Sequence, residues 1–274
     1  MTVLLAFKLF TVPVLVALVS LAARRFGAVM GGLLMGLPWM TAPVLLFLAF
    51  EKGIAWFCDA SVGATVAPVS VASFLFAYGW AAHLLRGRRF APVFCLIVAI
   101  IAFAVSATVL GAQDWTPTTA AAAAFVALIS SRFLLPKPTH SEQVVPLPWW
   151  DIPVRMVTSG LMVLALNAVA DVAGPRLSGI VASYPVILTS VVLFMHSLSG
   201  VDAVLGLLRG LSVSLLAFIV FFLVATVVAP AHGMAAAYVA SVAAGLTASG
   251  SLIVISRALD RRHARKASVA VDHK

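Results

Sequence analysis

Two prolines lie inside long apolar segments, and hydroxyl-bearing residues flank both of them. The first segment reads MGLPWMTAP around Pro38, and the second reads ASYPVILTS around Pro185. Proline cannot donate the backbone hydrogen bond of a helix interior, so each segment should kink or unwind and expose backbone carbonyls and amides. Inside a membrane, such groups are tolerated only where protein or a water-filled cavity surrounds them. The pair therefore indicates either a solute-binding site or two kinks that only aid packing.

The candidate solute-binding residues at these breaks are the two prolines and their neighbours. They are Pro38, Trp39, Thr41, Ser183, Tyr184, Pro185 and Thr189. Carbonyls and hydroxyls at broken helices also hold sodium in transporters. Sodium coupling, facilitated movement and exchange are therefore all left open by the sequence.

Three further residues within apolar segments are candidates for solute contact. Lys8 lies about two turns into the first segment, and Arg155 occupies the equivalent place in a later one. A charge in hydrocarbon costs several kcal/mol, so both cations either extend to the nearest interface, where Asp151 pairs with Arg155, or guard an anion path. Asn167 is the clearest polar residue deep in an apolar segment, and its amide either links helices or contacts solute.

The remaining polar residues give no sign of catalysis. His83 and His196 end apolar segments, where we expect interfacial side chains. The sequence has no H-E-x-x-H, G-x-S-x-G or Walker motif and no paired carboxylates, and its two cysteines exclude a cysteine metal site. We therefore predict that the protein is not an enzyme and has no catalytic residue, cofactor or metal. All acidic residues lie at segment ends, in loops or in the tail, which argues against carboxylate-based proton coupling.

The composition sets the environment in which these residues must lie. Hydrophobic residues make up 63% of the 274 residues and charged residues only 10%, and the mean hydropathy is +1.12. Such a chain has too little polar surface to cover a soluble globule, so we predict an all-α polytopic membrane protein. The net charge of +9 comes from bases at segment ends and in the C-terminal RALDRRHARK stretch. This placement favours anionic lipid headgroups over nucleic acid as a partner.

Charges and Gly and Pro punctuation divide the chain into nine predicted transmembrane helices of about 20 residues each. The predicted helices are 3–23, 27–50, 58–84, 90–111, 117–135, 150–171, 174–197, 203–229 and 232–256. Lys and Arg gather on one side of this arrangement, so the positive-inside rule predicts an external N-terminus and a cytoplasmic C-terminus. The proline breaks fall in the second and seventh helices.

A single offset relates the two halves of the chain. The offset between Pro38 and Pro185 is 147 residues, and it aligns other glycines and phenylalanines without gaps. The aligned pairs include Gly32 with Gly179, Gly53 with Gly200, Gly63 with Gly210 and Phe74 with Phe221. These matches indicate an internal duplication.

The duplication predicts two inverted repeats of five and four helices. We expect repeat 1 at 1–135, a polar linker at 136–148, repeat 2 at 149–256 and a basic cytoplasmic tail at 257–274. Because five helices precede the linker, repeat 2 enters the membrane from the opposite side. Inverted repeats with a site at their interface are common in secondary transporters.

The second half also resembles a known family. The segment SGIVASYPVILTSVVLFMHSLSG, a following span rich in Leu and Phe, and a short PAHG turn resemble the GlpM family of small bacterial inner-membrane proteins. The positions that carry the resemblance are Gly179, Tyr184, Pro185 and Gly200, with Gly32, Leu37, Pro38 and Gly53 as weaker counterparts. The resemblance implies a bacterial inner-membrane location and an accessory role in exopolysaccharide production. It supplies no binding residues, and this chain is twice the length of such proteins.

These observations predict a multi-pass inner-membrane transporter or exporter of a small anionic or amphipathic solute, with its site where the two broken helices cross. The alternative is a non-transporting accessory protein of envelope or exopolysaccharide assembly. The expected partners are the lipid bilayer, anionic lipid headgroups at the basic tail and the small-molecule solute, with no nucleic acid. A homodimer is left open.

Overall fold

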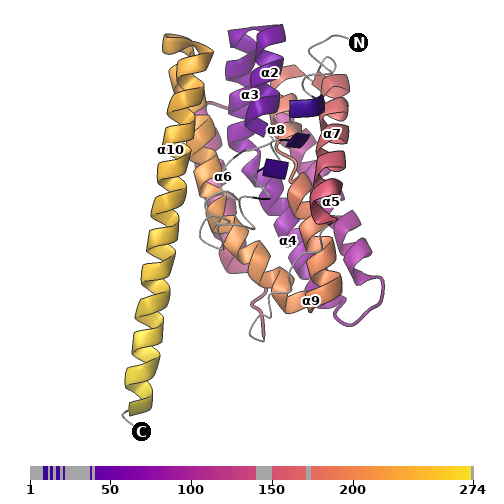
Figure 1. Cartoon of the computed structure of the whole chain (residues 1–274), viewed down its shortest axis with the longest axis vertical. Helices are drawn as coiled ribbons and strands as arrows, with labels where there is room; N and C mark the ends of the chain where they lie inside the picture. The colour runs from indigo at the N-terminus through magenta and orange to yellow at the C-terminus, as the bar shows by residue number, and fades with distance from the viewer. Residues whose placement is uncertain are drawn as a thin grey trace.

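The computed structural model describes residues 9–11, 13–14, 17–18, 21, 38, 41–139, 150–170 and 174–272, and every regular element among them is helical. The helices are α2 (Thr41–Lys52), α3 (Ile54–Val66), α4 (Pro68–Leu84), α5 (Ala91–Gly111), α6 (Pro117–Leu134), α7 (Asp151–Ala170), α8 (Gly174–Ala182), α9 (Val186–Ser214) and α10 (Leu216–Asp272). They form one elongated bundle, and the C-terminal part of α10 runs past its end (Figure 1).

The outer surface of the bundle is apolar. Four stretches of the described residues are long and apolar enough to cross a bilayer, namely Ile54–Leu84, Ala91–Gly111, Pro117–Leu134 and Met195–Ile255. Large apolar side chains such as Phe94, Val105 and Phe125 are more than half exposed on these helices. Apolar surface of this extent is solvated by lipid rather than by water. The chain is a membrane-embedded helical protein, and the nine crossings and their orientation stay predictions.

Prolines and caps begin several of the helices. Pro68, Pro92 and Pro117 lie in the first turns of α4, α5 and α6, where the missing N–H removes no helical hydrogen bond. Thr116 caps α6, since its hydroxyl accepts a hydrogen bond from the Thr119 N–H at 3.2 Å. The third predicted helix, 58–84, is corrected in one respect, because α3 begins at Ile54 and joins α4 at Ala67. The joint lies where Pro68 cannot donate a hydrogen bond to the preceding turn.

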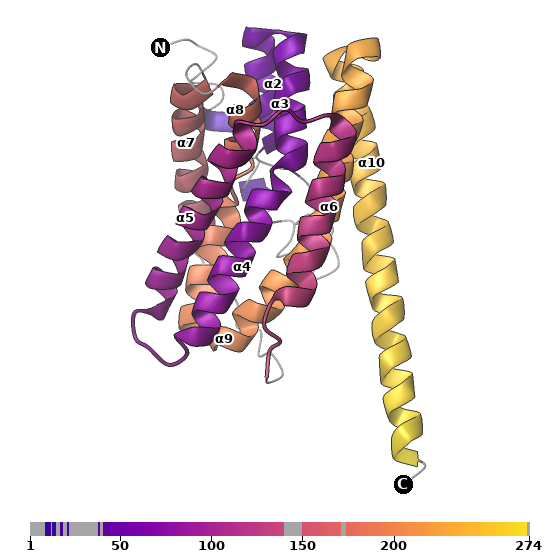
Figure 2. The ribbon, with the colours of Figure 1, turned by 180° about the vertical axis from the view of Figure 1, so that it is seen from behind.

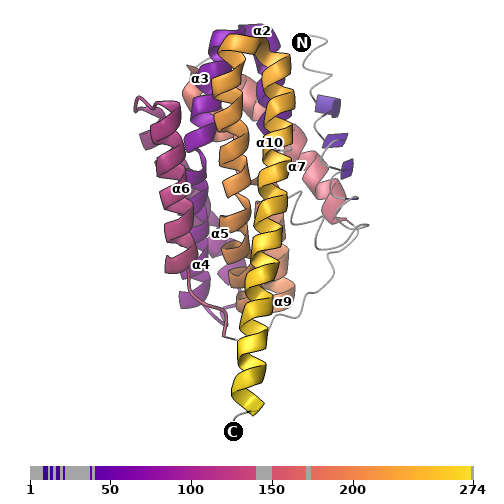
Figure 3. The same cartoon turned by 90° about the vertical axis from the view of Figure 1, so that its left-hand side faces the viewer.

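Glycines with positive φ separate the long helical stretches. Gly53 precedes α3 with φ 87° and ψ 175°, and Gly200 interrupts α9 with φ 84° and ψ −175°. Gly233 interrupts α10 with φ 80° and ψ 171°. Gly200 lies in the gap predicted between the seventh and eighth helices, whereas Gly233 lies just inside the ninth predicted helix, 232–256. The two arms of α10 on either side of Gly233 lie side by side (Figure 3).

The interior consists of two main hydrophobic clusters. In the first, Phe74 and Leu75 of α4 share a cluster with Leu188 and Val192 of α9. The second joins residues of α2, including Val44, Leu45 and Leu48, to residues of α10, including Phe218, Phe221 and Phe222. Helix α3 packs against α2, α8 and α10, so it lies between the two halves of the chain.

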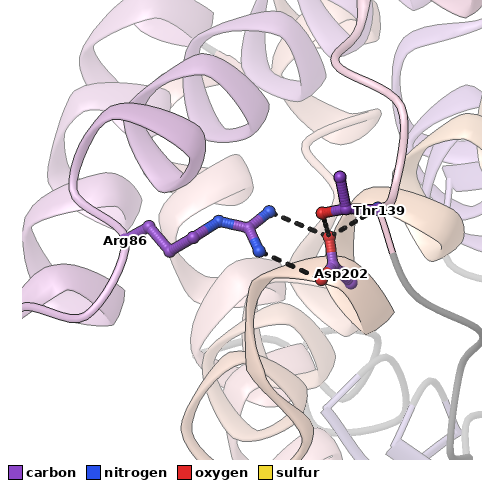
Figure 4. A network of polar contacts seen from close by, with 3 residues as sticks. All are labelled: Arg86, Thr139 and Asp202. Atoms are coloured by element: carbon purple, nitrogen blue, oxygen red, sulfur yellow. Dashed lines mark hydrogen bonds and ion pairs between the residues drawn. The ribbon is translucent and has the colours of Figure 1, made fainter.

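A polar network ties three segments together at one end of the bundle. The Arg86 guanidinium, in the connection after α4, donates to both carboxylate oxygens of Asp202 at 2.8 and 3.0 Å. The backbone N–H and the hydroxyl of Thr139 donate to the same carboxylate at 3.0 and 3.1 Å (Figure 4). The α4–α5 connection and the turn within α9 therefore lie at the same end, whereas the α5–α6 connection lies at the other (Figure 2).

We predict that Gly53→Ala and Gly200→Ala each destabilise the protein by about 1–2 kcal/mol, because a Cβ is strained at positive φ. Neither new methyl group would meet another atom within 4 Å, so backbone strain alone causes the loss. Thermal unfolding in detergent measures it. The control is Gly210→Ala, in a helix with open space around the new Cβ, where the melting temperature should hold or rise. Equal changes in all three variants would contradict the prediction.

Candidate functional site

The helix interruption predicted at Pro185 is present and has a local cause. Helix α8 ends at Ala182, α9 begins at Val186, and Pro185 has the non-helical angles φ −81° and ψ 66°. Because Pro185 has no N–H, the carbonyl of Val181 takes the Tyr184 N–H instead, at 3.0 Å. The turn thus tightens just before the proline.

Less of the first break is described, and what is described matches the second. Pro38 lies outside a helix and is buried, and α2 begins at Thr41. The carbonyl of Pro38 accepts the Ala42 N–H at 2.9 Å, and the carbonyl of Pro185 accepts the Thr189 N–H at 3.0 Å. The two hydrogen bonds are related by the offset of 147 residues that the sequence suggested.

The two breaks contact each other directly. The Thr41 hydroxyl donates to the carbonyl of Ala182, the last residue of α8, at 3.0 Å. In an intact helix, that carbonyl would accept a hydrogen bond from the backbone N–H four residues further along the chain. Pro38, Thr41 and Ser183 are all buried, so the contact lies inside the protein. Sequence segments 141 residues apart thus meet where α2 begins and α8 ends.

Close backbone packing holds α8 in place beside the breaks. A Cβ added to Gly179 would collide with the carbonyl of Ala60 on α3, and a Cβ added to Gly63 would collide with the carbonyl of Arg176. Only glycine allows the two helices to approach this closely. The crossing of α3 and α8 therefore fixes the end of α8, where the Ala182 carbonyl is presented to Thr41.

Hydroxyl and aromatic groups surround the second break. The Thr189 hydroxyl oxygen lies within hydrogen-bonding distance of the Pro185 carbonyl oxygen, at 3.0 Å, and of the Tyr184 phenol oxygen, at 3.1 Å. The Tyr184 ring makes edge contacts with Phe74 and Phe103, at centroid distances of 6.3 and 5.1 Å. The break thus combines polar groups with an apolar aromatic wall, an arrangement that suits an amphipathic ligand.

A buried pair that we did not predict lies further along α9. His196 is 7% exposed, and its Nδ1 lies 3.0 Å from the Tyr78 phenol oxygen. The phenol also donates to the Val192 carbonyl at 3.3 Å. A protonated Nδ1 that donates to the phenol oxygen therefore gives the imidazole, the phenol and the carbonyl a hydrogen-bond partner each. His196 is therefore buried against α4 within the protein, and its expected position at the membrane interface stays a prediction. The sequence carried no signal for the pair, because Tyr78 and His196 are 118 residues apart.

Six of the ten predicted solute-contact residues lie at the two prolines within the part of the chain that the structure describes. These six are Pro38, Thr41, Ser183, Tyr184, Pro185 and Thr189. Lys8 and Trp39 lie outside the described residues, as do the side chains of Arg155 and Asn167. The last two belong to α7, which packs against α8 and α9. Among the described residues, no group of three His, Cys, Asp or Glu side chains could hold a metal ion.

No family model matches the chain, and no curated protein and no solved structure matches it significantly. The resemblance to the GlpM family therefore stays an expectation from sequence.

We predict that Thr41→Val destabilises the protein by about 1–3 kcal/mol, because it leaves the buried Ala182 carbonyl without its partner. Thr226→Val is the matched control, since Thr226 is equally buried and donates only to the Phe222 carbonyl within its own helix. The control should lose less than about 1 kcal/mol. Denaturant or thermal unfolding in detergent compares the two variants, and equal losses would remove the special role of the contact.

Proposed function

We propose that the protein is a secondary transporter or exporter of a small anionic or amphipathic solute, which binds where the two broken helices cross. The observation that carries the proposal is the hydrogen bond from Thr41 to the Ala182 carbonyl, because it joins the two interruptions in the protein interior. Interrupted helices that meet at a repeat interface form the solute sites of many secondary transporters.

Matching backbone geometry supports a duplicated architecture. Gly53 and Gly200, 147 residues apart, have nearly the same φ and ψ. The packing is also reciprocal at the same offset. Phe74 shares a cluster with Val192, and Phe221, its equivalent, shares a cluster with Leu45, the equivalent of Val192.

The positions of the glycine turns support inversion of the two halves. Gly53 lies at the start of the helical stretch Ile54–Leu84, and Arg86 lies just beyond its end. Because Arg86 binds Asp202, the turn at Gly200 lies at the far end of this stretch from Gly53. If the two halves are copies that run in opposite directions through the membrane, their equivalent glycine turns must lie at opposite ends of the bundle.

Each broken helix has a segment suited to movement. Helix α2 lies between Pro38 and Gly53, and the first arm of α9 lies between Pro185 and Gly200. When such a segment rocks, a few residues at its ends absorb the change in backbone angles. Here a proline break lies at one end of each segment and a glycine without close neighbours lies at the other. The burial of Thr41 and Ser183 corresponds to a state closed around the solute site.

The solute class follows from the groups at the crossing. Thr41, Ser183 and Thr189 provide hydroxyls, and Tyr184 with its phenylalanine neighbours provides an apolar surface. The cations Lys8 and Arg155, in the first helix of each predicted repeat, give the anionic preference.

An accessory role in envelope or exopolysaccharide assembly is the second candidate. The observation that favours it is the backbone contact of α3 with α8 at Gly63 and Gly179, because it fills one side of the crossing with protein. A bundle that is packed solid around its breaks needs no solute.

A flux assay separates the two candidates. A thermal-shift screen of small anionic and amphipathic metabolites on the purified protein first identifies a ligand, whose radiolabelled form is then followed into proteoliposomes. The double variant Pro38→Ala, Pro185→Ala should straighten both helices and lower flux at least about tenfold, with expression unchanged.

Pro230→Ala is the matched control, because Pro230 is exposed and lies inside α10 away from the breaks. It should keep normal flux. Unchanged flux in the double variant, or no ligand for the wild-type protein together with a defect in envelope assembly, would favour the accessory role.

A further inference from the structure

Two arginines come together at the end of the bundle where the Arg86–Asp202 network lies. Arg209 of α9 donates from Nη1 to the carbonyl of Leu135, just after α6, at 2.7 Å. Close by, the Ser131 hydroxyl donates to the Ser212 hydroxyl at 3.1 Å, so α6 and α9 are held side by side. Arg132, in the last turn of α6, follows Ser131 and lies three residues before Leu135, so both arginines lie at this contact between α6 and α9.

One guanidinium nitrogen of Arg132 lacks a partner. Its Nη1 is buried and makes no hydrogen bond within the part of the chain that the structure describes. Leaving a charged donor unpaired costs more than leaving a neutral one. The repulsion between the two arginines adds to this cost. An anion between them would remove both penalties.

The described carboxylate that lies nearest to Arg209 along α9 already accepts hydrogen bonds from other residues. Asp202 lies two turns before Arg209, and it accepts two hydrogen bonds from Arg86 and two from Thr139. Neither Arg132 nor Arg209 forms an ion pair with a described acidic side chain. No carboxylate of the described residues therefore balances the charge of this arginine pair.

We infer that Arg132 and Arg209 together bind a phosphate group, presented by an anionic phospholipid at the membrane surface or free in solution. Guanidinium groups suit phosphate because each offers several donors in a planar fork. The position also suits a lipid, since Phe133 and Leu134 beside Arg132 are 77% and 59% exposed. An acyl chain would lie against these side chains while its phosphate reaches the arginines, as in basic sites between transmembrane helices. The inference does not depend on transport.

The test uses the full-length protein in nanodiscs of phosphatidylcholine alone or with increasing phosphatidylglycerol, and follows thermal stability. A second arm adds inorganic phosphate to phosphatidylcholine nanodiscs, against chloride at equal ionic strength. Arg132→Gln should lower the apparent affinity for the anionic probe about fivefold or more. In phosphatidylcholine alone it should melt at or above the wild-type temperature, because it removes an unpaired charge and a repulsion.

Arg88→Gln is the matched control. Arg88 is exposed in the connection after α4, and its loss removes the same formal charge. It should keep the wild-type response within about twofold, which distinguishes the site from attraction to the basic surface in general. A response to phosphatidylglycerol alone identifies the phospholipid, and a response to phosphate in neutral nanodiscs identifies free phosphate. If Arg132→Gln responds like the wild type, or if both variants lose the response equally, the inference is overturned.

Discussion

The fold depends on how the backbone is satisfied where its helices are interrupted. A proline inside an apolar bundle frees carbonyls that neither water nor lipid can bind, and each unsatisfied group costs several kcal/mol there. The protein meets this requirement with hydroxyls from both halves of the chain. Thr41 donates to the Ala182 carbonyl and Ser183 donates to the Gly179 carbonyl.

This use of hydroxyls changes the meaning of the candidate site. The sequence suggested Thr41, Ser183 and Thr189 near the breaks as groups for a solute, and in the structure they bind backbone carbonyls instead. In the proposed transport cycle, a solute would compete with the carbonyls for these donors. Such competition links solute binding to helix movement, because a hydroxyl that turns to the solute releases the contact between the breaks. The link is thermodynamic, since a ligand shifts an equilibrium only through contacts that differ between states.

Local sequence signals predicted several helix boundaries, because their causes are local. Pro185 interrupts a helix by lacking a donor, and Gly200 turns the chain between two predicted helices. Gly233 turns it one residue after the predicted start of the ninth helix. Thr116 and Pro117 begin α6 as their residue types require. The beginning of α3 was predicted at position 58, four residues after its actual start at Ile54.

The side-chain pairs could not be predicted in the same way. Arg86 with Asp202 and Tyr78 with His196 join residues more than 100 positions apart, and neither partner has a local pattern that points to the other. Even the offset of 147 gives no help, because a duplicated backbone does not duplicate its polar contacts.

In the proposed duplication, the Tyr78–His196 pair marks a difference between two equivalent contacts of the halves. At the same offset, the equivalents of Tyr78 and His196 are Ala225 and Ala49, which are buried and have no polar side chain. The contact of α4 with α9 therefore has a hydrogen-bonded pair, and the equivalent positions on α10 and α2 have small apolar residues. In the proposed inverted arrangement these two positions lie towards opposite membrane faces. Opening one side would break a buried hydrogen bond, which costs about 1–3 kcal/mol, and opening the other would not. In the proposed transport cycle, the same backbone motion would thus have different energies in its two directions, and this difference would favour opening on the side that lacks the pair.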